Sequence, residues 1–251
     1  VFCLSSCAVR SVFVPTSQNI MLFDENKQIQ ANAYVGTNTA QLQLAHNPVK
    51  HLVVGLSTNY GAGLSIYEGY LGTYGYSKNN AHWRCELLGG AGYTNNYSQI
   101  DNAWTSAFKP GNTSYETVSL YNKFFVQPAF GFFSKIDMYK LSYSFSFSCK
   151  GSYIDFKKYI YREIDADETK NTGATVYLVN KEYHNKDLYL LEPAFTNKIG
   201  LRNVYAVLQA EVMMPYSKSI DIRNTKFSPV FLFSFGIQYN FIFKRPKKAT
   251  P

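Results

Sequence analysis

The 251-residue chain lacks any continuous apolar run of the roughly 18 to 20 residues that a transmembrane helix requires, which argues against a helical membrane protein. Heptad repeats, Cys/His metal-ligand spacings and a G-x-S-x-G motif are also missing from the sequence. Coiled coils, zinc modules and the common serine hydrolases are therefore disfavoured. We expect no cofactor and no metal site.

Cysteine is scarce, with four residues in the chain: Cys3, Cys7, Cys85 and Cys149. Cys85 and Cys149 both fall on the apolar phase of the segments that contain them. We therefore expect buried or lipid-facing thiols there rather than a disulfide.

Acidic residues are outnumbered, since 25 Lys and Arg against 17 Asp and Glu give a formal charge of +8 and a pI near 9.1. The basic residues are spread along the chain, apart from the terminal "KRPKKATP", which reads as a solvated basic tail. A dispersed positive charge does not favour a nucleic-acid partner, and we expect none.

Aromatic residues are abundant: 21 Tyr and 19 Phe contribute to a 17% aromatic content in a chain that is only 46% hydrophobic. In residues 139–156, "YKLSYSFSFSCKGSYIDF", apolar or small residues occupy the odd positions up to 153 and Lys or Ser the even positions from 140 to 152. Alternation with period two predicts a two-faced strand, roughly 50–60 Å long at ~3.3 Å per residue. Ordinary strands have about five or six residues.

Ten strands are predicted along the chain, with short polar connections alternating with longer ones. The even count and the two-faced strands predict an all-β fold, a single antiparallel transmembrane β-barrel with both chain ends at the periplasmic rim. The segments 97–116, 157–187 and 217–227 are expected to be outer loops. Merging or losing a pair of strands would give eight. The predicted strands are 27–36, 40–46, 51–62, 66–77, 83–96, 117–134, 139–156, 188–199, 203–216 and 228–243.

The outward phases of the clearest strands carry no charged residue. On 228–243 this phase runs through Phe231, Phe233 and Phe235, and a lipid-facing Lys or Arg at the bilayer midplane would cost about 2–4 kcal/mol. The competing interpretation is a soluble sandwich or lipocalin-like barrel, which would turn its aromatic residues inward. Pro128 and Pro193 fall inside predicted strands, where we expect bulges.

The inward phases carry charges, which at eight to ten strands would largely fill the lumen. Buried charges need partners, so a salt-bridged plug is expected. A proton or ion path is the alternative. The predicted lumen charge network is Glu68, Arg84, Glu86, Lys140, Lys150, Glu192 and Glu211.

The last strand, "FSFGIQYNFIF", resembles the aromatic terminal strand of bacterial outer-membrane proteins, and "LSSC" (residues 4–7) resembles a lipobox. The second resemblance implies cleavage before Cys7 and acylation of that residue. With the junction "NIMLFDENKQIQANAYVG", the chain resembles small outer-membrane β-barrel lipoproteins of Bacteroidota, and in general architecture the OmpA/OmpX-like small barrels. The implied division is a residual signal segment (1–6), a lipid-anchored periplasmic arm (7–26), the barrel (27–243) and a basic periplasmic tail (244–251).

No catalytic residues are predicted. Ten-stranded omptin proteases place Asp and Asp–His pairs near the outer rim, whereas His46, His51 and His82 lie at or beside predicted periplasmic turns. His184 lies in a predicted outer loop without a matching carboxylate pair. We therefore expect that the protein is not an enzyme.

The favoured function is a non-catalytic accessory or scaffold subunit of a larger outer-membrane complex, in secretion, lipoprotein export or barrel assembly. A small stand-alone porin or channel is the alternative, and a barrel hydrolase is a weaker one. Outer-membrane lipid and protein subunits are the expected partners, and no small-molecule substrate is identified. The residues predicted to contact partners are Trp104, Tyr115, Tyr159, Tyr161, Lys244, Arg245, Lys247 and Lys248.

Overall fold

The computed structural model describes residues 17–18, 28–36, 39–61, 64–76, 82–106, 109–136, 141–165, 169, 171, 173–201, 203–217 and 230–242. Almost all of them lie in ten β-strands. No helix in these ranges is long and apolar enough to cross a membrane. The strands are β1 (Gln28–Gly36), β2 (Thr39–His46), β3 (Leu52–Gly61), β4 (Leu64–Tyr76), β5 (Trp83–Ser106), β6 (Lys109–Ile136), β7 (Leu141–Asp165), β8 (Val176–Leu201), β9 (Val204–Tyr216) and β10 (Val230–Ile242).

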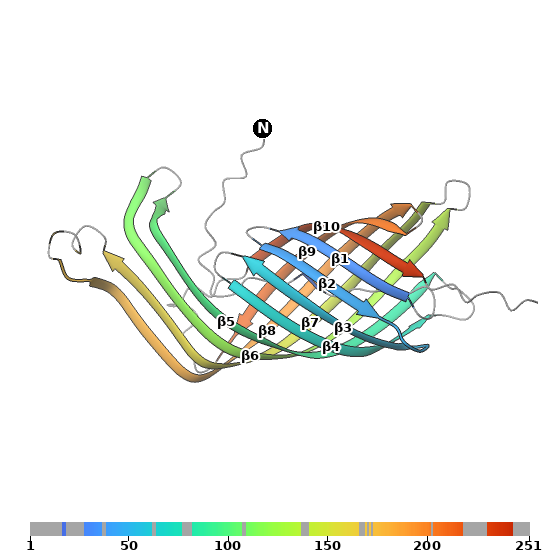
Figure 1. Ribbon diagram of the computed structural model, residues 1–251, viewed down its shortest axis with the longest axis horizontal. Helices are drawn as coiled ribbons and strands as arrows, with labels where there is room; N and C mark the ends of the chain where they lie inside the picture. The colour runs from blue at the N-terminus through green and yellow to red at the C-terminus, as the bar shows by residue number, and fades with distance from the viewer. Residues whose placement is uncertain are drawn as a thin grey trace, which may run out of the picture.

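The ten strands close into one antiparallel barrel (Figure 1). Each strand pairs with its neighbours in the chain, and β1 closes the ring against β10, with Gln28 opposite Ile242 and Gly36 opposite Ser234. Closure leaves no unpaired strand edge around the barrel itself. The prediction of ten strands in an antiparallel barrel is confirmed, and the alternative count of eight is wrong.

The two faces of the wall differ in the way that the alternation predicts. Along β10, Phe231, Phe233 and Phe235 point outward with about 60–70% of each side chain exposed. The alternate positions Ser234, Gln238 and Asn240 are buried in the interior. Apolar residues therefore face outward and polar residues inward, which is the arrangement of a barrel surrounded by hydrocarbon and the opposite of a soluble barrel.

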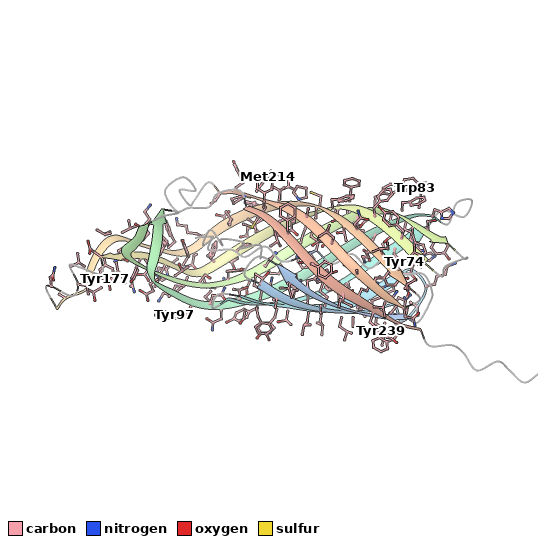
Figure 2. All side chains as sticks on the ribbon, turned by 90° about the horizontal axis from the view of Figure 1, so that it is seen from above. Tyr74, Trp83, Tyr97, Tyr177, Met214 and Tyr239 are labelled. Atoms are coloured by element: carbon pink, nitrogen blue, oxygen red, sulfur yellow. The ribbon has the colours of Figure 1, made fainter. Side chains whose placement is uncertain are left out.

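Aromatic residues gather on the outer surface near both ends of the barrel wall. At the rim with short connections, which we call the short-turn rim, Trp83 stacks on Phe130 with ring centroids 5.0 Å apart, and Tyr239 lies 4.4 Å from Phe241. Figure 2 shows Trp83 and Tyr239 at this end. Toward the other rim, Tyr153 and Tyr189 pair across strands at 5.3 Å. Such pairs match the interfacial girdles of transmembrane barrels.

Four strands continue beyond the other rim as a curved sheet (Figure 1). β5, β6, β7 and β8 have 24 to 28 residues each, against 8 to 13 in the other six strands. We call their distal parts the extension, and Figure 2 shows Tyr97 and Tyr177 there. The prediction that 97–116 and 157–187 form loops is wrong for most of these residues, because both pair as strands. Most of 217–227 lies outside the described residues.

A β-bulge turns the inward phase of β7 at the start of the extension. Leu120 pairs with Lys158 but Tyr121 pairs with Phe156, so one extra residue enters β7. Tyr159 and Tyr161 then pack with Phe156 in a buried cluster. Both tyrosines were expected on an exposed loop, and the bulge explains why they are buried instead. The cluster contains Tyr121, Ile154, Phe156, Tyr159, Tyr161, Leu188, Leu190 and Met213.

The two strand prolines flank one residue of β7. Cys149 pairs with Pro193 of β8, while on the other side the β6–β7 pairing skips from Val126 to Ala129. The strand register is the same before and after that gap, so the expected bulge at Pro128 is absent. The sheet tolerates the missing amide as a local gap in the ladder. Cys149 and Cys85 are both free thiols, as expected.

Candidate functional site: the barrel lumen

Charged side chains from six strands line the interior of the barrel. All of those in the described part are more than nine-tenths buried, and positive and negative charges balance at four each. Ion pairing inside the lumen can therefore offset much of the cost of removing these charges from bulk water. They are Glu68 on β4, Arg84 and Glu86 on β5, Lys123 on β6, Lys150 on β7, Glu192 and Lys198 on β8, and Glu211 on β9.

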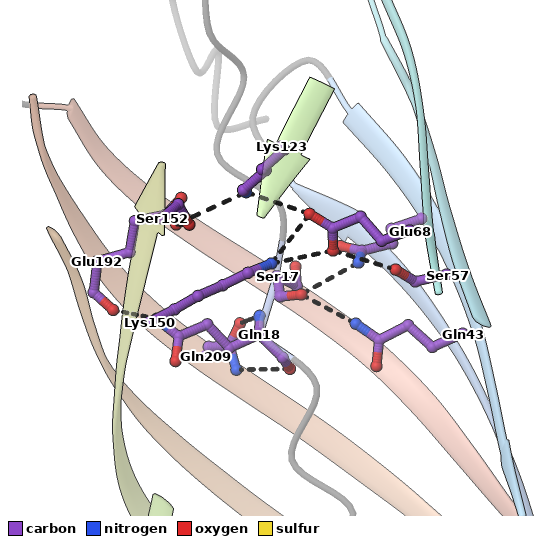
Figure 3. Close-up of polar contacts among 11 residues, drawn as sticks. Ser17, Gln18, Gln43, Ser57, Glu68, Lys123, Lys150, Ser152, Glu192 and Gln209 are labelled. Carbon is purple, nitrogen blue, oxygen red and sulfur yellow. Dashed lines mark hydrogen bonds and ion pairs between the residues drawn. The ribbon is translucent and has the colours of Figure 1, made fainter. Parts of the chain in front are cut away.

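Four of these residues form a chain of ion pairs across the lumen (Figure 3). The Lys150 Nζ atom lies 3.0 and 2.9 Å from the two carboxylate oxygens of Glu68. Lys123 lies 3.1 Å from Glu68 and 3.6 Å from Glu192, so it joins the two carboxylates. We call Glu68, Lys123, Lys150 and Glu192 the lumen ion network. It links β4 to β6, β7 and β8 through the interior.

Neighbouring residues hold this network in place. Ser57 donates to Glu68 at 3.3 Å and Ser152 donates to Glu192 at 3.0 Å. The Lys150 ammonium also lies 4.1 Å from the centroid of the Phe125 ring, within range of a cation–π contact. The carboxylates thus receive hydrogen bonds beyond the ion pairs, as buried charges require.

A second charged group lies closer to the short-turn rim. The Arg84 guanidinium lies 4.4 Å from the centroid of the Phe133 ring. Lys198 donates to Gln238 at 2.8 Å, and Gln238 donates to Asn240. Glu211 is not part of this second group. It pairs across strands with Ala194, two positions from Glu192 of the lumen ion network, and neither of its carboxylate oxygens has a hydrogen-bond partner within the described residues.

Two residues of the segment before β1 lie inside the barrel, although the sequence predicts a periplasmic arm there. Ser17 is 3% exposed and Gln18 is fully buried. The Ser17 carbonyl accepts hydrogen bonds from Gln41 and Gln43 of β2, while the Gln18 side chain accepts one from Ser148 of β7. β2 and β7 are five strands apart in the ring of ten, on opposite walls. Ser17 and Gln18 therefore bridge the lumen from wall to wall.

The structure gathers part of the predicted lumen set and adds to it. Glu68, Lys150 and Glu192 meet in one network, whereas Arg84 and Glu86 lie elsewhere in the interior. Lys123 and Lys198 were not predicted to face the lumen. Lys123 shares the phase of the inward-facing Gln127, and Lys198 lies near the end of the predicted strand 188–199, in phase with Glu192. Lys140, Cys7, Lys244, Arg245, Lys247 and Lys248 lie outside the described residues, as do the side chains of Trp104 and Tyr115.

The histidines have structural contacts. His46, His51 and His82, near the short-turn rim, each place Nδ1 within 2.7–3.1 Å of a backbone carbonyl. His184 of β8 lies 2.9 Å from Glu182. Among the described residues, no group of three or more His, Cys, Asp or Glu side chains could hold a metal ion. That the protein is not an enzyme stays a prediction.

No protein-family model and no curated protein sequence matches the chain. Among solved structures it is similar to the KdgM porin, with 10% identity and a TM-score of 0.34, over 86% of this chain and 99% of that one. It is also similar to the Acinetobacter baumannii outer membrane protein Omp33, with 10% identity and a TM-score of 0.27, over 86% and 98%. The CymD monoaromatic hydrocarbon channel has 8% identity and a TM-score of 0.28, over 88% and 90%.

These structures are porins, a channel and an outer-membrane protein, so they agree with the expected small outer-membrane β-barrel and do not test the lipoprotein or Bacteroidota expectations. The names of the porin and the channel correspond to the alternative, a small porin or channel, and not to the expected accessory or scaffold subunit, which is therefore corrected and not proposed. At these identities and TM-scores the likeness is one of barrel architecture only.

Proposed function

We propose that the protein is a small stand-alone channel of the outer membrane, with a narrow lumen that passes small solutes or ions. The observation that carries the proposal is the position of Ser17 and Gln18. The backbone of these two residues fits between the opposite walls β2 and β7, in addition to the side chains of the strands. At the level of Ser17 and Gln18, the side chains of the barrel wall therefore do not fill the lumen by themselves.

The charge balance of the lumen predicts its selectivity. Within the described residues, four cationic and four anionic side chains are buried there, so this part of the interior has no large net charge to favour one sign of ion. Figure 3 shows residues of the lumen ion network beside Ser17 and Gln18, and side chains at this height leave room for small solutes at most in the proposed passage. We expect small, brief conductance events with weak ion selectivity.

The test is ion conduction by the purified full chain in planar lipid bilayers under a salt gradient, with the reversal potential as readout. Glu192→Gln removes one ion-paired lumen carboxylate, so it should shift the potential toward anion selectivity. Lys198→Gln should shift it toward cation selectivity. Lys157→Gln is the matched control, because Lys157 is half exposed and pairs with Asp155 on the outside.

Opposite shifts for the two lumen variants, with no shift for the control, would support a conducting lumen. Channel activity that ignores the lumen substitutions would come from another path and would contradict the proposal. If neither the wild type nor any variant conducts ions, the barrel is sealed and the proposed channel is wrong.

The anchor belongs to the same proposal. Acylation of Cys7, as the lipobox resemblance implies, would tether the segment before β1 to a membrane surface. Palmitate labelling of cells that express the chain with its natural leader, compared with Cys7→Ala, tests it. Labelling that persists in the variant would remove the anchor from the proposal and leave the channel untouched.

A further inference from the structure

The main chain of Ser17 and Gln18 is held by glutamine side chains of the wall. The Ser17 carbonyl accepts from Gln41 at 3.0 Å and from Gln43 at 2.9 Å. The Gln18 amide donates to the Gln209 Oε1 atom at 2.7 Å, and Gln209 Nε2 donates back to the Gln18 carbonyl at 3.4 Å. The three glutamines therefore bind peptide groups, which every residue of a polypeptide possesses.

Other strands position two of these glutamines. The Asn32 side chain of β1 donates to the Gln43 Oε1 atom at 3.3 Å, and Gln209 donates to the Thr196 hydroxyl at 2.7 Å. All three glutamines are almost completely buried. A neutral amide supplies both a donor and an acceptor, so it can satisfy a peptide group without burying a further charge. The wall thus holds hydrogen-bonding side chains in position to bind the main chain of a polypeptide.

Side-chain contacts are fewer than main-chain contacts and come from other strands. Ser17 donates to Ser234 of β10 at 3.0 Å. The Gln18 side-chain amide donates to the Glu192 carbonyl and accepts from Ser148. These side-chain contacts would favour a segment with the sequence Ser-Gln over other segments. The glutamine contacts alone would not discriminate, because they bind only peptide groups.

We propose that Gln41, Gln43 and Gln209 form a binding site for an extended polypeptide inside the lumen. Ser17 and Gln18 are its resident occupant, and a polypeptide that enters the lumen displaces them. The inference depends on the proposed channel in one respect only, namely that the peptide-binding site lies on the path of transport through the lumen. A tethered occupant competes at a high effective concentration, so a free peptide binds measurably only when the resident contacts are weakened.

The experiment uses the full chain in detergent and a fluorescein-labelled synthetic peptide with the sequence of residues 11–22, SVFVPTSQNIML. Gln18→Pro removes the amide that donates to Gln209 and the side chain that contacts Glu192 and Ser148. Fluorescence anisotropy should detect peptide binding to Gln18→Pro at least tenfold more tightly than to the wild type. Adding Gln209→Leu should abolish that gain, and so should N-methylation of the peptide at its Gln18 amide.

A folded Gln18→Pro protein, verified by its heat-modifiable mobility on gels, that fails to bind the peptide would overturn the inference. So would binding that is indifferent to Gln209→Leu. Bilayer recordings separate this inference from the proposed channel. Peptide binding without ion currents would contradict only the channel, and ion currents without peptide binding would contradict only the peptide-binding site.

A second measurement keeps the inference testable if Gln18→Pro does not fold. Ser17 and Ser234 face each other, so Ser17→Cys/Ser234→Cys in a background with the four native cysteines changed to Ala should form a disulfide on mild oxidation. Gln18→Ala in the same chain weakens the resident contacts by removing those to Glu192 and Ser148, and excess peptide should then slow disulfide formation by at least threefold. Absence of the disulfide, or a rate that the peptide does not change, would contradict a displaceable occupant.

Discussion

Lys150 binds both carboxylate oxygens of Glu68, at 3.0 and 2.9 Å, with both side chains almost fully removed from solvent. Glu68 also accepts from Lys123, so two ammonium groups share this one carboxylate. Glu68→Gln leaves two buried ammonium groups without their shared partner. We expect it to lower the free energy of unfolding by about 3–5 kcal/mol, and Lys150→Met by less.

Urea titrations in detergent micelles, followed by tryptophan fluorescence, would measure both variants. The double variant Glu68→Gln/Lys150→Met should cost less than the sum of the single changes, because the residues interact directly. Lys157→Met, on the outside, should stay within about 1 kcal/mol of the wild type. Equal and small effects for Glu68→Gln and Lys157→Met would mean that the network contributes little to stability.

Gly55 leaves room for a tyrosine in the lumen. It pairs directly with Tyr70 of β4, and a Cβ atom built on Gly55 would overlap the Tyr70 ring. Gly55→Ala should therefore cost about 1–3 kcal/mol through overpacking. Tyr70→Leu in the same chain should recover part of that loss. The unfolding free energies of the single and double variants test the contact.

Gly151→Ala is the control for this prediction, because the nearest heavy atom to its added Cβ would be the Val126 carbonyl oxygen at 4.0 Å. A loss at Gly151 as large as at Gly55 would point to a general cost of removing strand glycines. A loss at Gly55 that Tyr70→Leu does not relieve would contradict the steric explanation.

The barrel wall could be predicted from the sequence because one face of each strand is confined to hydrocarbon. That constraint produces a strict alternation of apolar and polar residues along each strand, as at Phe231, Phe233 and Phe235. The extension could not be predicted, because its surroundings do not impose the same pattern. Its β7 segment "KKYIYREID" mixes charges and aromatics and is a strand nevertheless.

The candidate site shows the same division. Lys150 could be assigned to the lumen from its phase in the long alternating run of 139–156. The position of Ser17 and Gln18 could not, because their partners lie far away in the sequence, with Gln18 and Gln209 separated by 191 positions. Such contacts depend on barrel closure, and no local pattern in the sequence records them.

Two leucines with the same exposure test where the membrane ends. Leu208 lies near the middle of β9 on the outer face of the barrel and is 54% exposed, whereas Leu178 lies on the extension in β8 and is 55% exposed. If hydrocarbon surrounds the barrel and water surrounds the extension, Leu208→Arg should cost about 2–4 kcal/mol in phospholipid vesicles. Leu178→Arg should cost close to nothing.

The measurement is the free energy of unfolding from vesicles for both variants, together with the fraction of each that inserts and folds. The residue type, the new residue and the exposure are matched, so the surrounding medium is the main difference between them. A soluble barrel would tolerate both substitutions equally, since both leucines would face water. If both arginine variants were equally stable, a surrounding membrane would not explain the outward-facing aromatic residues. The proposed channel would then be wrong as well.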